Sequence, residues 1–525
     1  MGGAFMIKNS EGKIWHFRKG LIDFSGNVIK SVFGIILLVL SVSSVIYTCE
    51  LKNTETALEV TFYNRDNILK YIILCIIFLS VLLIKKRKKK NIEKKKISFN
   101  EDKINQCLIG VHAIIGLIWV VGIQLKPRAD QWFCSTIGGN LLTSNYDKID
   151  FSKGGYLDQY PFQSGLVLIF KMVYKFFGIN NYMAFQMLNI IALIIMDIFL
   201  IKILKKFISV RVEKITLFFL ILFFPIVFYT TFLYGNLIGC ALSIVAIFYE
   251  LSFFEKHKIL DMIFSAMFIS LAILFKSNYL IILLAMIIFT ILDWIIHLQK
   301  RNIIFVIVII IGYMIATSGP IALLNSQENV NLGTGIPKVA WIAMGMQESD
   351  MAPGWYNEYN ANTYLNNNCD SELTSKEALN YINDRVKYFE KNPKYTLKFY
   401  AKKMVSQWCE PTFGGIWINQ FDKNIVVSSY MDSILNGHKL GKILVWILDI
   451  VQSIIYILAL IYVFMNRKNR NIYVWLPATA FIGGFLFHML WEAKGQYTFT
   501  YFILLIPYAA IALKNIVKKI EDTEN

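Results

Sequence analysis

Charged residues are scarce in this chain, and long apolar runs take their place. Only 17% of the 525 residues are charged, whereas 56% are hydrophobic, and the apolar residues gather in blocks such as 28–48 and 214–234. Blocks of about 20 apolar residues cross a bilayer as helices. The composition excludes a soluble globular protein, a disordered tail and a secreted disulfide scaffold, and it predicts an all-α polytopic membrane protein.

Motifs for nucleotides and zinc are missing as well. The sequence contains no Walker A motif and no dinucleotide fingerprint, so ATP-driven transport and nucleotide-sugar chemistry have no support. The six histidines are dispersed, and neither they nor the seven cysteines form a cluster with the spacing of zinc ligands. Cys134, Cys369 and Cys409 fall in regions expected outside the membrane, but no pattern or spacing there requires a disulfide.

The net charge of +17 is concentrated in short loops between the apolar blocks. Residues 85–96 read KKRKKKNIEKKK, with nine basic residues and one acidic residue. Basic loops stay on the cytoplasmic side, so this segment fixes the orientation of the chain. No module that reads bases accompanies it, and we expect membrane lipids rather than nucleic acid as its partner.

Alternation of inner and outer loops predicts about 12 spans, with both ends of the chain cytoplasmic. One short apolar segment, 164–177, contains Lys171 and Lys175 and would place a later basic loop outside if it crossed. We therefore expect this segment to lie in the outer interface or to enter only part-way. The predicted spans are 28–48, 68–84, 107–125, 183–204, 213–233, 235–253, 259–275, 279–298, 302–324, 441–465, 472–491 and 497–516.

These spans divide the chain into four parts. Residues 1–106 hold an N-terminal cytoplasmic segment, two spans and the basic loop, and residues 107–324 hold a membrane core whose first external loop is 126–163. Residues 325–439 are a hydrophilic insert, which we expect to be an external domain of mixed structure. Residues 440–525 hold the last spans and a short cytoplasmic tail.

Polar residues suited to chemistry gather at the outer ends of the spans, whereas the cytoplasmic loops are short and basic. A transporter would be expected to carry ionisable groups near the middle of the membrane. The clearest charged residues within spans are Asp197, Asp293 and Asp449, each near the inner end of its helix, where we expect it to face water. A function on the outer face of the plasma membrane is the better inference.

Two candidate groups lie in the first external loop. Asp130 follows a span closely and has Arg128 beside it, and a carboxylate near cations can stay ionised and act as a base. Asp158-Gln-Tyr160-Pro161 places a second carboxylate and an aromatic ring before the interfacial segment. Each group also has a structural interpretation, because a lone aspartate at a helix end often only faces water and Pro161 suits a first helical turn.

Three further groups come from later connections. Lys276 and Asn278 occupy a tight turn, where an ammonium can hold a phosphate or simply reach the lipid headgroups. Residues 341–347, ending in Gln347, and residues 353–357 carry glycines and aromatics that suit a sugar-binding wall or packing on the membrane. The last turn, a ligand site or a salt-bridged helix connection, contains Glu492, Lys494, Gln496 and Tyr497.

Taken in order, these elements resemble the GT-C glycosyltransferases that use polyprenyl-phosphate-linked sugars. That group contains the protein O-mannosyltransferases and the lipid A aminoarabinose transferase. The shared order is an aspartate just beyond an early span, a Y-x-x-x-Y-P segment, a K-x-N-Y connection, a W-x-x-M-G element before G-W-Y-N, and an E-x-K-x-Q-Y turn. The resemblance covers residues 109–525, so the first two spans look like an addition.

The resemblance implies a GT-C-like bundle and assigns roles to particular residues. In such enzymes an acidic residue of the first external loop is the catalytic base, which corresponds to Asp130, and many members have a second acid where this chain has Gln131. The late turn often carries an arginine where this chain has Gln496, so Lys494, Lys276 or Arg128 would contact the phosphate. Some members use a divalent metal ion, which stays open here, and no other cofactor is implied.

The chemistry of such a transfer suits these residues. A sugar on a lipid phosphate has a good leaving group, so cations suffice there while a carboxylate takes the proton of the acceptor hydroxyl. We predict an inverting transfer from a polyprenyl-phosphate carrier to an envelope glycan, lipid or protein, with Asp130 as base and Asp158 as the second candidate. The binding residues would be Arg128, Tyr160, Lys276, Asn278, Gln347, Glu492, Lys494, Gln496 and Tyr497.

Three other functions remain open at this stage. A lipid-linked glycan polymerase or ligase would use a lipid diphosphate as donor. A transporter of lipid-linked glycans would need a polar path through the bundle. A structural membrane component would need no site beside Asp130 at all.

Overall fold

The computed structural model describes residues 2–54, 58–88, 100–143, 151–208, 211–420 and 428–522. Within these residues the chain is helical apart from one antiparallel hairpin, β1 (Tyr47–Lys52) with β2 (Val60–Arg65). Residues 89–96 of the predicted basic loop lie outside the described part. All seven cysteines are free thiols.

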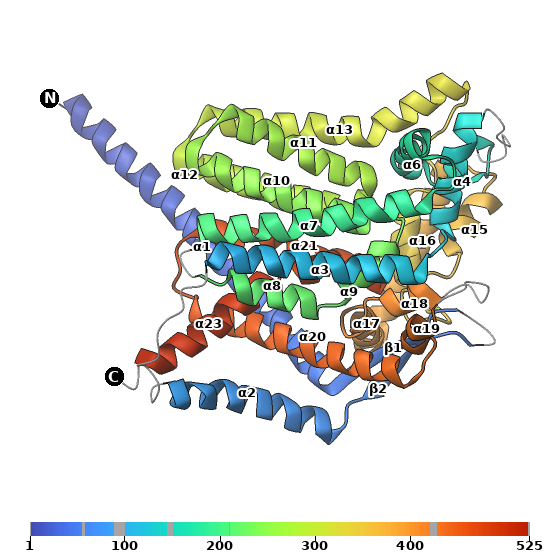
Figure 1. Cartoon of the computed structure of the whole chain (residues 1–525). Coiled ribbons are helices and arrows are strands. Elements are labelled where there is room, and N and C mark those ends of the chain that lie inside the picture. Colours follow the sequence, from blue (N-terminus) through green and yellow to red (C-terminus); the bar gives the residue numbers. More distant parts are fainter. Residues whose placement is uncertain are drawn as a thin grey trace.

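Most helices run side by side along one direction and form a bundle, with both termini at one end (Figure 1). This bundle contains α1 (Gly2–Ile46), α2 (Ile68–Lys88), α3 (Glu101–Ile123), α7 (Tyr182–Phe207), α8 (Glu213–Leu222), α9 (Pro225–Phe228), η4 (Tyr229–Thr231), α10 (Asn236–Lys256), α11 (Ile259–Phe275), η5 (Ser277–Tyr279), α12 (Leu280–His297), α13 (Lys300–Glu328), α20 (Lys439–Met465), η6 (Ile472–Trp475), α21 (Leu476–Leu490), α22 (Gly495–Ile503) and α23 (Ile506–Asp522). Its core is apolar and aromatic, with Leu193, Phe289 and Phe502 fully buried.

Eight of these helices are long and apolar enough to cross a membrane, and the chain is a multi-pass membrane protein. Two bent pairs, α8 with α9 and α22 with α23, turn by 59° and 44° at short breaks and would raise the count to 10. Pro225 is the first residue of α9 and Pro507 is the second residue of α23, and proline lacks the N–H that would continue the preceding helix. The predicted spans 68–84 and 259–275 fall on shorter apolar helices, so the count of twelve stays a prediction.

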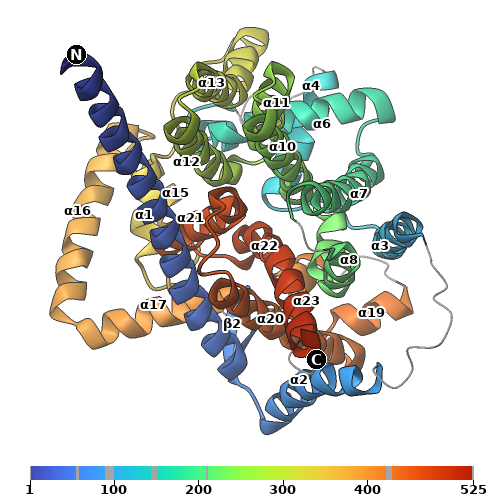
Figure 2. The same cartoon turned by 90° about the vertical axis from the view of Figure 1, so that its left-hand side faces the viewer.

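The opposite end of the bundle carries the helices of the first loop and of the insert. They are α4 (Asp130–Thr143), α5 (Tyr156–Gln159), η3 (Pro161–Gln163), α6 (Ser164–Phe177), α14 (Lys338–Gly345), α15 (Tyr359–Asn366), α16 (Ser371–Lys391), α17 (Pro393–Trp408), α18 (Gly415–Gln420) and α19 (Ser429–Leu435). α6, α16 and α17 lie across the bundle direction (Figure 2). For α6 this is the orientation predicted for a helix of the interface, and it buries one apolar face that includes Val167, Phe170 and Tyr174.

The insert differs from the prediction in one respect. Its described residues form helices and loops and contain no strand, so the mixed structure expected for 325–439 is wrong there. Two small apolar clusters of its own support it, one around Ala340 and Tyr364 and one around Phe389 and Phe399. The strands belong instead to the hairpin between α1 and α2, and Cys49 of β1 donates its N–H to the carbonyl of Cys409 at 2.9 Å.

The three aspartates within spans do not face water, which corrects the expectation from the sequence. Asp197, Asp293 and Asp449 are at most 1% exposed. Asp197 lies 2.8 Å from Nδ1 of His112, and Asp449 lies 2.7 Å from Nζ of Lys70. A buried carboxylate needs such partners because desolvation of an isolated charge is costly. The hydropathy pattern located the residues but not the partners, which come from other helices.

The Lys70 ion cluster joins the two N-terminal helices to the core, and its removal should destabilise the protein. Nζ of Lys70 lies 2.9 Å from Asp66 and donates to the carbonyl of Ser44 in α1. Lys70→Met leaves Asp449 buried without its cation, which costs about 3–5 kcal/mol. Thermal unfolding in detergent should show a lower midpoint for Lys70→Met, and the double variant with Asp449→Asn should recover part of it. An unchanged midpoint would mean that α2 does not pack there.

Candidate active site

Asp130 begins α4 at the end of the bundle opposite the termini (Figure 1). Its Oδ1 accepts a hydrogen bond from the Tyr156 hydroxyl at 3.1 Å, and its Oδ2 accepts one from the Tyr234 hydroxyl at 2.9 Å. Tyr156 belongs to α5, and Tyr234 lies between η4 and α10. The carboxylate is only half-buried, so two separate segments orient it while it stays accessible.

Both tyrosines act as donors to the carboxylate. Burial, followed by the negative charge of Asp130, raises the pKa of Tyr234 well above its ordinary value, so the hydroxyl keeps its proton. Burial likewise raises the pKa of Tyr156, with Cys134 and Asp130 adding to the effect. Each carboxylate oxygen has two lone pairs, so one on each remains for another proton donor. An aspartate held in this way is suited to act as a base.

Gln131, the residue after Asp130, positions a neighbouring segment of the chain. It is 5% exposed, and its Oε1 accepts the backbone N–H of Leu233 at 2.7 Å. This bond fixes the segment that presents Tyr234 to Asp130. Gln163 also donates to the Tyr234 hydroxyl, so the phenol is held on both sides. The amide therefore supports the carboxylate through Tyr234.

The ammonium of Lys276 lies over the ring of Tyr234. Its Nζ is 3.9 Å from the centroid of the Tyr234 ring and 5.5 Å from that of Tyr497, and it donates to Oδ1 of Asn236 at 3.0 Å. The residue is 9% exposed. Burial lowers the pKa of Lys276 to about 7, although the negative charge of Asp130 opposes the shift. The ammonium is desolvated and fixed, as a phosphate-binding cation would be.

The turn between α21 and α22 adds a carboxylate and a second ammonium. Glu492 is 4% exposed, and the Tyr497 hydroxyl donates to both of its oxygens at 3.4 Å. Burial raises the pKa of Glu492 to about 7, with Lys494 opposing and Asp130 adding to the shift. Gln496, 8% exposed, accepts a bond from Asn236 through its backbone carbonyl at 3.0 Å. This turn therefore shares Asn236 with Lys276.

Lys494 is paired with a residue that the sequence did not indicate. Its Nζ lies 2.7 Å from Oε2 of Glu59, in the turn between β1 and β2. Burial lowers the pKa of Lys494, but the charge and hydrogen bond of Glu59, together with the charges of Glu492 and Asp130, outweigh that effect and raise it. The residues before 109 looked like an addition to the core, yet this hairpin carries a buried carboxylate to the last turn.

Arg128 makes its described contacts with α18. Its guanidinium donates to the carbonyls of Trp417 and Ile418 and lies 5.4 Å from the centroid of the Trp417 ring. Nζ of Lys494 lies 5.5 Å from the same ring. Two cations thus flank one indole, a contact that aromatic rings favour. The phosphate contact predicted for Arg128 stays a prediction, and its observed bonds hold α18 against the first loop.

Three other predicted residues have partners outside the Asp130 group. Oδ2 of Asp158 accepts the N–H of Gly154 at 2.8 Å and the Tyr364 hydroxyl at 3.1 Å, which ties the first loop to the insert. Gln347 accepts a bond from the side chain of Asn357 at 2.9 Å within the insert. Asn278 is half-buried in η5, and its carbonyl accepts from Tyr501 at 3.4 Å. Ligand contacts by these three remain predictions.

Aromatic rings of the insert pack against the first loop and the turn after α21. The ring of Trp341 stacks on Trp491, with centroids 5.9 Å apart and planes at 8°, and it lies 6.0 Å from Tyr160. By contrast Trp355 is 1% exposed and donates to Ser406 at 2.8 Å, so it belongs to the interior. Gly345 packs closely on the last turn, where a Cβ would come 2.3 Å from the carbonyl oxygen of Leu490. The aromatic prediction therefore divides into an accessible ring, Trp341, and a structural one.

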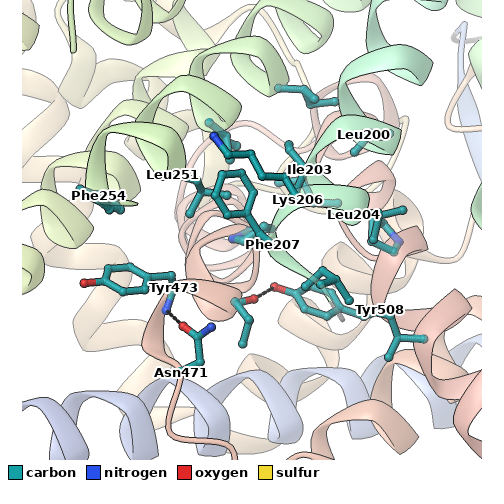
Figure 3. A pocket seen from close by; sticks show the side chains of 18 of the residues that line it. Leu200, Ile203, Leu204, Lys206, Phe207, Leu251, Phe254, Asn471, Tyr473 and Tyr508 are labelled. Atoms are coloured by element: carbon teal, nitrogen blue, oxygen red, sulfur yellow. Dashed lines mark hydrogen bonds between the residues drawn. The ribbon is translucent and has the colours of Figure 1, made fainter. Parts of the chain in front are cut away.

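Within the described residues, neither a set of three metal ligands nor the apolar cavity of the bundle lies at the Asp130 group. Among the described residues, the acidic side chains around Asp130 do not converge as a set of three ligands, and two ammonium groups lie near them. An apolar cavity of about 340 Å³ lies between α7, α10, η6 and α23, where Leu251, Phe254 and Tyr508 line it (Figure 3). That cavity is not part of the Asp130 group.

Comparison with known proteins gives little beyond this geometry. No protein-family model and no curated protein matches the chain. Two solved structures of ArnT from Cupriavidus metallidurans, one bound to undecaprenyl phosphate and one in the apo state, match over 77% of this chain and 77% of theirs. The identities are 11% and 12%, and the TM-scores are 0.30 and 0.32. We base the function proposed below on the residues themselves.

Proposed function

We propose that this protein is an integral membrane glycosyltransferase. It moves a sugar from a polyprenyl-phosphate carrier to an envelope glycan, lipid or protein on the outer face of the membrane. Inversion at the anomeric carbon follows from a single displacement. The donor class rests on the resemblance of the motifs, and the reaction class rests on the residues around Asp130.

One observation carries the proposal: a base and a phosphate-binding cation are linked through one tyrosine. The Tyr234 hydroxyl donates to Asp130 at 2.9 Å, and the face of its ring lies 3.9 Å from the Lys276 ammonium. Displacement on a glycosyl phosphate needs a proton acceptor for the nucleophile and positive charge for the leaving group. The sequence separates the two residues by a long stretch of chain, and the fold joins them.

In the proposed step the acceptor hydroxyl oxygen attacks the anomeric carbon, and its proton passes to Asp130. The new oxygen–carbon bond forms as the bond from the same carbon to the phosphate oxygen breaks. The leaving polyprenyl phosphate takes the electron pair, and the Lys276 ammonium stabilises the added charge. Preformed charge of this kind stabilises the transition state without reorganisation.

The remaining predicted residues surround this pair. Lys494, held by Glu59, supplies further positive charge, and Glu492 and Tyr497 orient the donor or the acceptor. Tyr160 and Trp341 offer ring faces to a sugar. Asn278, Gln347 and Gln496 are proposed as further contacts, and Asp158 is retained as the second acidic candidate.

A transfer assay tests the proposal against its alternatives. Membranes with and without the protein are supplied with radiolabelled polyprenyl-phosphate sugars and native envelope extract, and the anomer of the product is compared with that of the donor. Inverted product that depends on the protein is expected. Transfer from lipid-diphosphate glycans alone would indicate a polymerase or ligase, and labelled lipid crossing the membrane without transfer would indicate a transporter.

Trp341→Ala should weaken sugar binding more than it slows the chemical step. A ring contact of this kind contributes about 0.5–1.5 kcal/mol, which corresponds to a KM about 2- to 13-fold higher with little change in kcat. Trp132→Ala is the matched control, because that tryptophan lies in α4 and is 49% exposed. Equal KM values for the two variants would remove Trp341 from the sugar site.

A further inference from the structure

A second cluster of titratable side chains lies at the end of the bundle that carries both termini, away from Asp130 (Figure 1). It consists of His257, between α10 and α11, with Asp293 and His297 of α12. One ligand atom from each residue lies within 4.8 Å of the other two. This cluster could not be predicted from the sequence, because Asp293 and His297 share a helix face but His257 lies 36 residues before Asp293.

We propose that this cluster binds a divalent transition-metal ion, with Zn²⁺ as its occupant. Nδ1 of His297 lies 2.9 Å from one carboxylate oxygen of Asp293, and Nδ1 of His257 lies 4.0 Å from the other. Ligands of a tetrahedral zinc ion with bonds of about 2.0–2.1 Å are separated by about 3.3 Å. The observed separations lie on both sides of that value, so small rotations of the imidazole rings complete the set.

The carboxylate is oriented as a metal ligand usually is. Asp293 is fully buried, and its oxygens accept hydrogen bonds from the Tyr473 hydroxyl at 2.5 Å and from the Asn302 side chain at 2.6 Å. Outer hydrogen bonds of this kind fix ligand geometry in metal sites. Tyr473 also lines the apolar cavity between α10 and η6, where its ring is labelled in Figure 3. These donors come from α13 and η6, so the site would join three parts of the bundle.

His257 is the residue that points to a ligand. Its Nδ1 is buried and has no hydrogen-bond partner among the described residues. The residue ends α10 with φ 47°, in the left-handed region, and its carbonyl accepts a bond from Arg301 at 2.7 Å. That arrangement directs the ring toward His297, with centroids 5.5 Å apart. A metal ion would use the nitrogen that otherwise lacks a partner.

The three ligand types favour some metal ions over others, and one of the ligands is accessible to an ion from solvent. Two imidazoles and one carboxylate suit Zn²⁺ and related borderline ions, whereas Mg²⁺ and Ca²⁺ prefer oxygen ligands. The His297 side chain is 40% exposed, which provides a path for the ion. Three protein ligands would leave a fourth position for water. We assign the ion a structural role that fixes the α10–α11 connection against α12.

Metal titration of the full chain tests this assignment. The protein is purified with a tag that contains no histidine, stripped with a chelator, and titrated in detergent with Co²⁺, whose visible absorption reports four-coordinate binding. One equivalent of Co²⁺, displaced by Zn²⁺ and not by Mg²⁺, is expected. Absence of such binding in the wild-type protein would overturn the proposal.

The variants separate the site from other histidines. His257→Ala and His297→Ala should each lower the affinity at least 10-fold, and Tyr473→Phe should lower it about 10-fold through the orientation of Asp293. His438→Ala is the control. That histidine also lies near an aspartate, at 3.4 Å from Asp432, but it immediately precedes α20 and is not part of the cluster. His297→Ala alters an exposed side chain and should fold, so wild-type affinity in that variant would refute the site.

Discussion

Asp130→Asn should abolish sugar transfer while leaving the protein folded. The amide matches the carboxylate in size, but it cannot accept the proton of the acceptor hydroxyl. Loss of a general base lowers the rate by roughly a hundred- to ten-thousandfold, and we expect about a thousandfold here. The measurement is the initial rate of label transfer in membranes that contain equal amounts of wild-type or variant protein. Donor binding should be compared at acidic pH, because loss of the Asp130 charge also lowers the pKa of Lys276 and the ammonium is then retained only at lower pH.

Control variants identify the base if the result differs. Asp350→Asn alters an exposed carboxylate of the insert and should leave the rate unchanged. Should Asp130→Asn retain full activity, the base is a different carboxylate, and Asp158→Asn and Glu492→Gln are the next variants to measure. Glu492 is a serious competitor because its pKa of about 7 lets it accept a proton near neutral pH. Asp158, bonded to Gly154 and Tyr364, should mainly affect the stability of the loop.

Tyr234→Phe would show whether the tyrosine link itself matters. The substitution removes the hydroxyl that donates to Asp130 but keeps the ring beneath Lys276. A decrease smaller than that of Asp130→Asn is consistent with a positioning role for this residue. The comparison with Asp130→Asn therefore separates orientation of the base from its chemistry.

The membrane architecture could be predicted because a bilayer imposes strong constraints on length and charge. A run of about 20 apolar residues has few alternatives to a spanning helix. The segment 164–177 was short, contained two lysines and would have placed a later basic loop outside if it crossed. These facts predicted a helix that lies in the interface or enters only part-way, and α6 lies across the bundle direction (Figure 2). The insert was harder, because the short helices of a polar segment depend on packing that hydropathy does not describe.

The candidate site was predictable only in part, since its residues come from turns far apart in the sequence. Charged groups in the turns between apolar runs were visible, and Asp130, Lys276, Glu492 and Lys494 do lie in one electrostatic group. Their connecting residues were not visible. Glu59 belonged to a segment that looked like an addition, and nothing local marks Tyr234 as the partner of two ionised groups. Contacts between residues far apart in the sequence could be identified only from the folded structure.

The buried aspartates illustrate the same limit. A carboxylate near the end of an apolar run is consistent with either exposure to water or pairing inside the bundle. The hydropathy pattern cannot distinguish these states because the partner is on another helix, as His112 is for Asp197. Asp293 was expected to face water, yet it is fully buried between histidines.

Sugar transfer should depend on pH through the charge of Lys276, and this is the second large effect that we expect. Burial lowers the pKa of Lys276 to about 7, so the ammonium is present below that pH and is lost as the pH rises through it. If the ammonium holds the donor phosphate, kcat/KM should fall above about pH 7. Below pH 7, Lys276→Met should reduce activity by roughly a hundred- to a thousandfold, as expected for removal of a charge that stabilises the leaving group, and the difference from the wild type should shrink at higher pH, where the wild type loses its ammonium.

Lys276→Arg distinguishes this cause from the titration of Glu492. A guanidinium stays charged throughout the range, so the decrease above pH 7 should disappear in this variant even if its activity is lower. Glu492→Gln should keep the decrease in activity but shift it to lower pH, because loss of that negative charge lowers the pKa of Lys276 further. An unchanged alkaline decrease in Lys276→Arg would assign the titration to another group and would remove Lys276 from the donor phosphate.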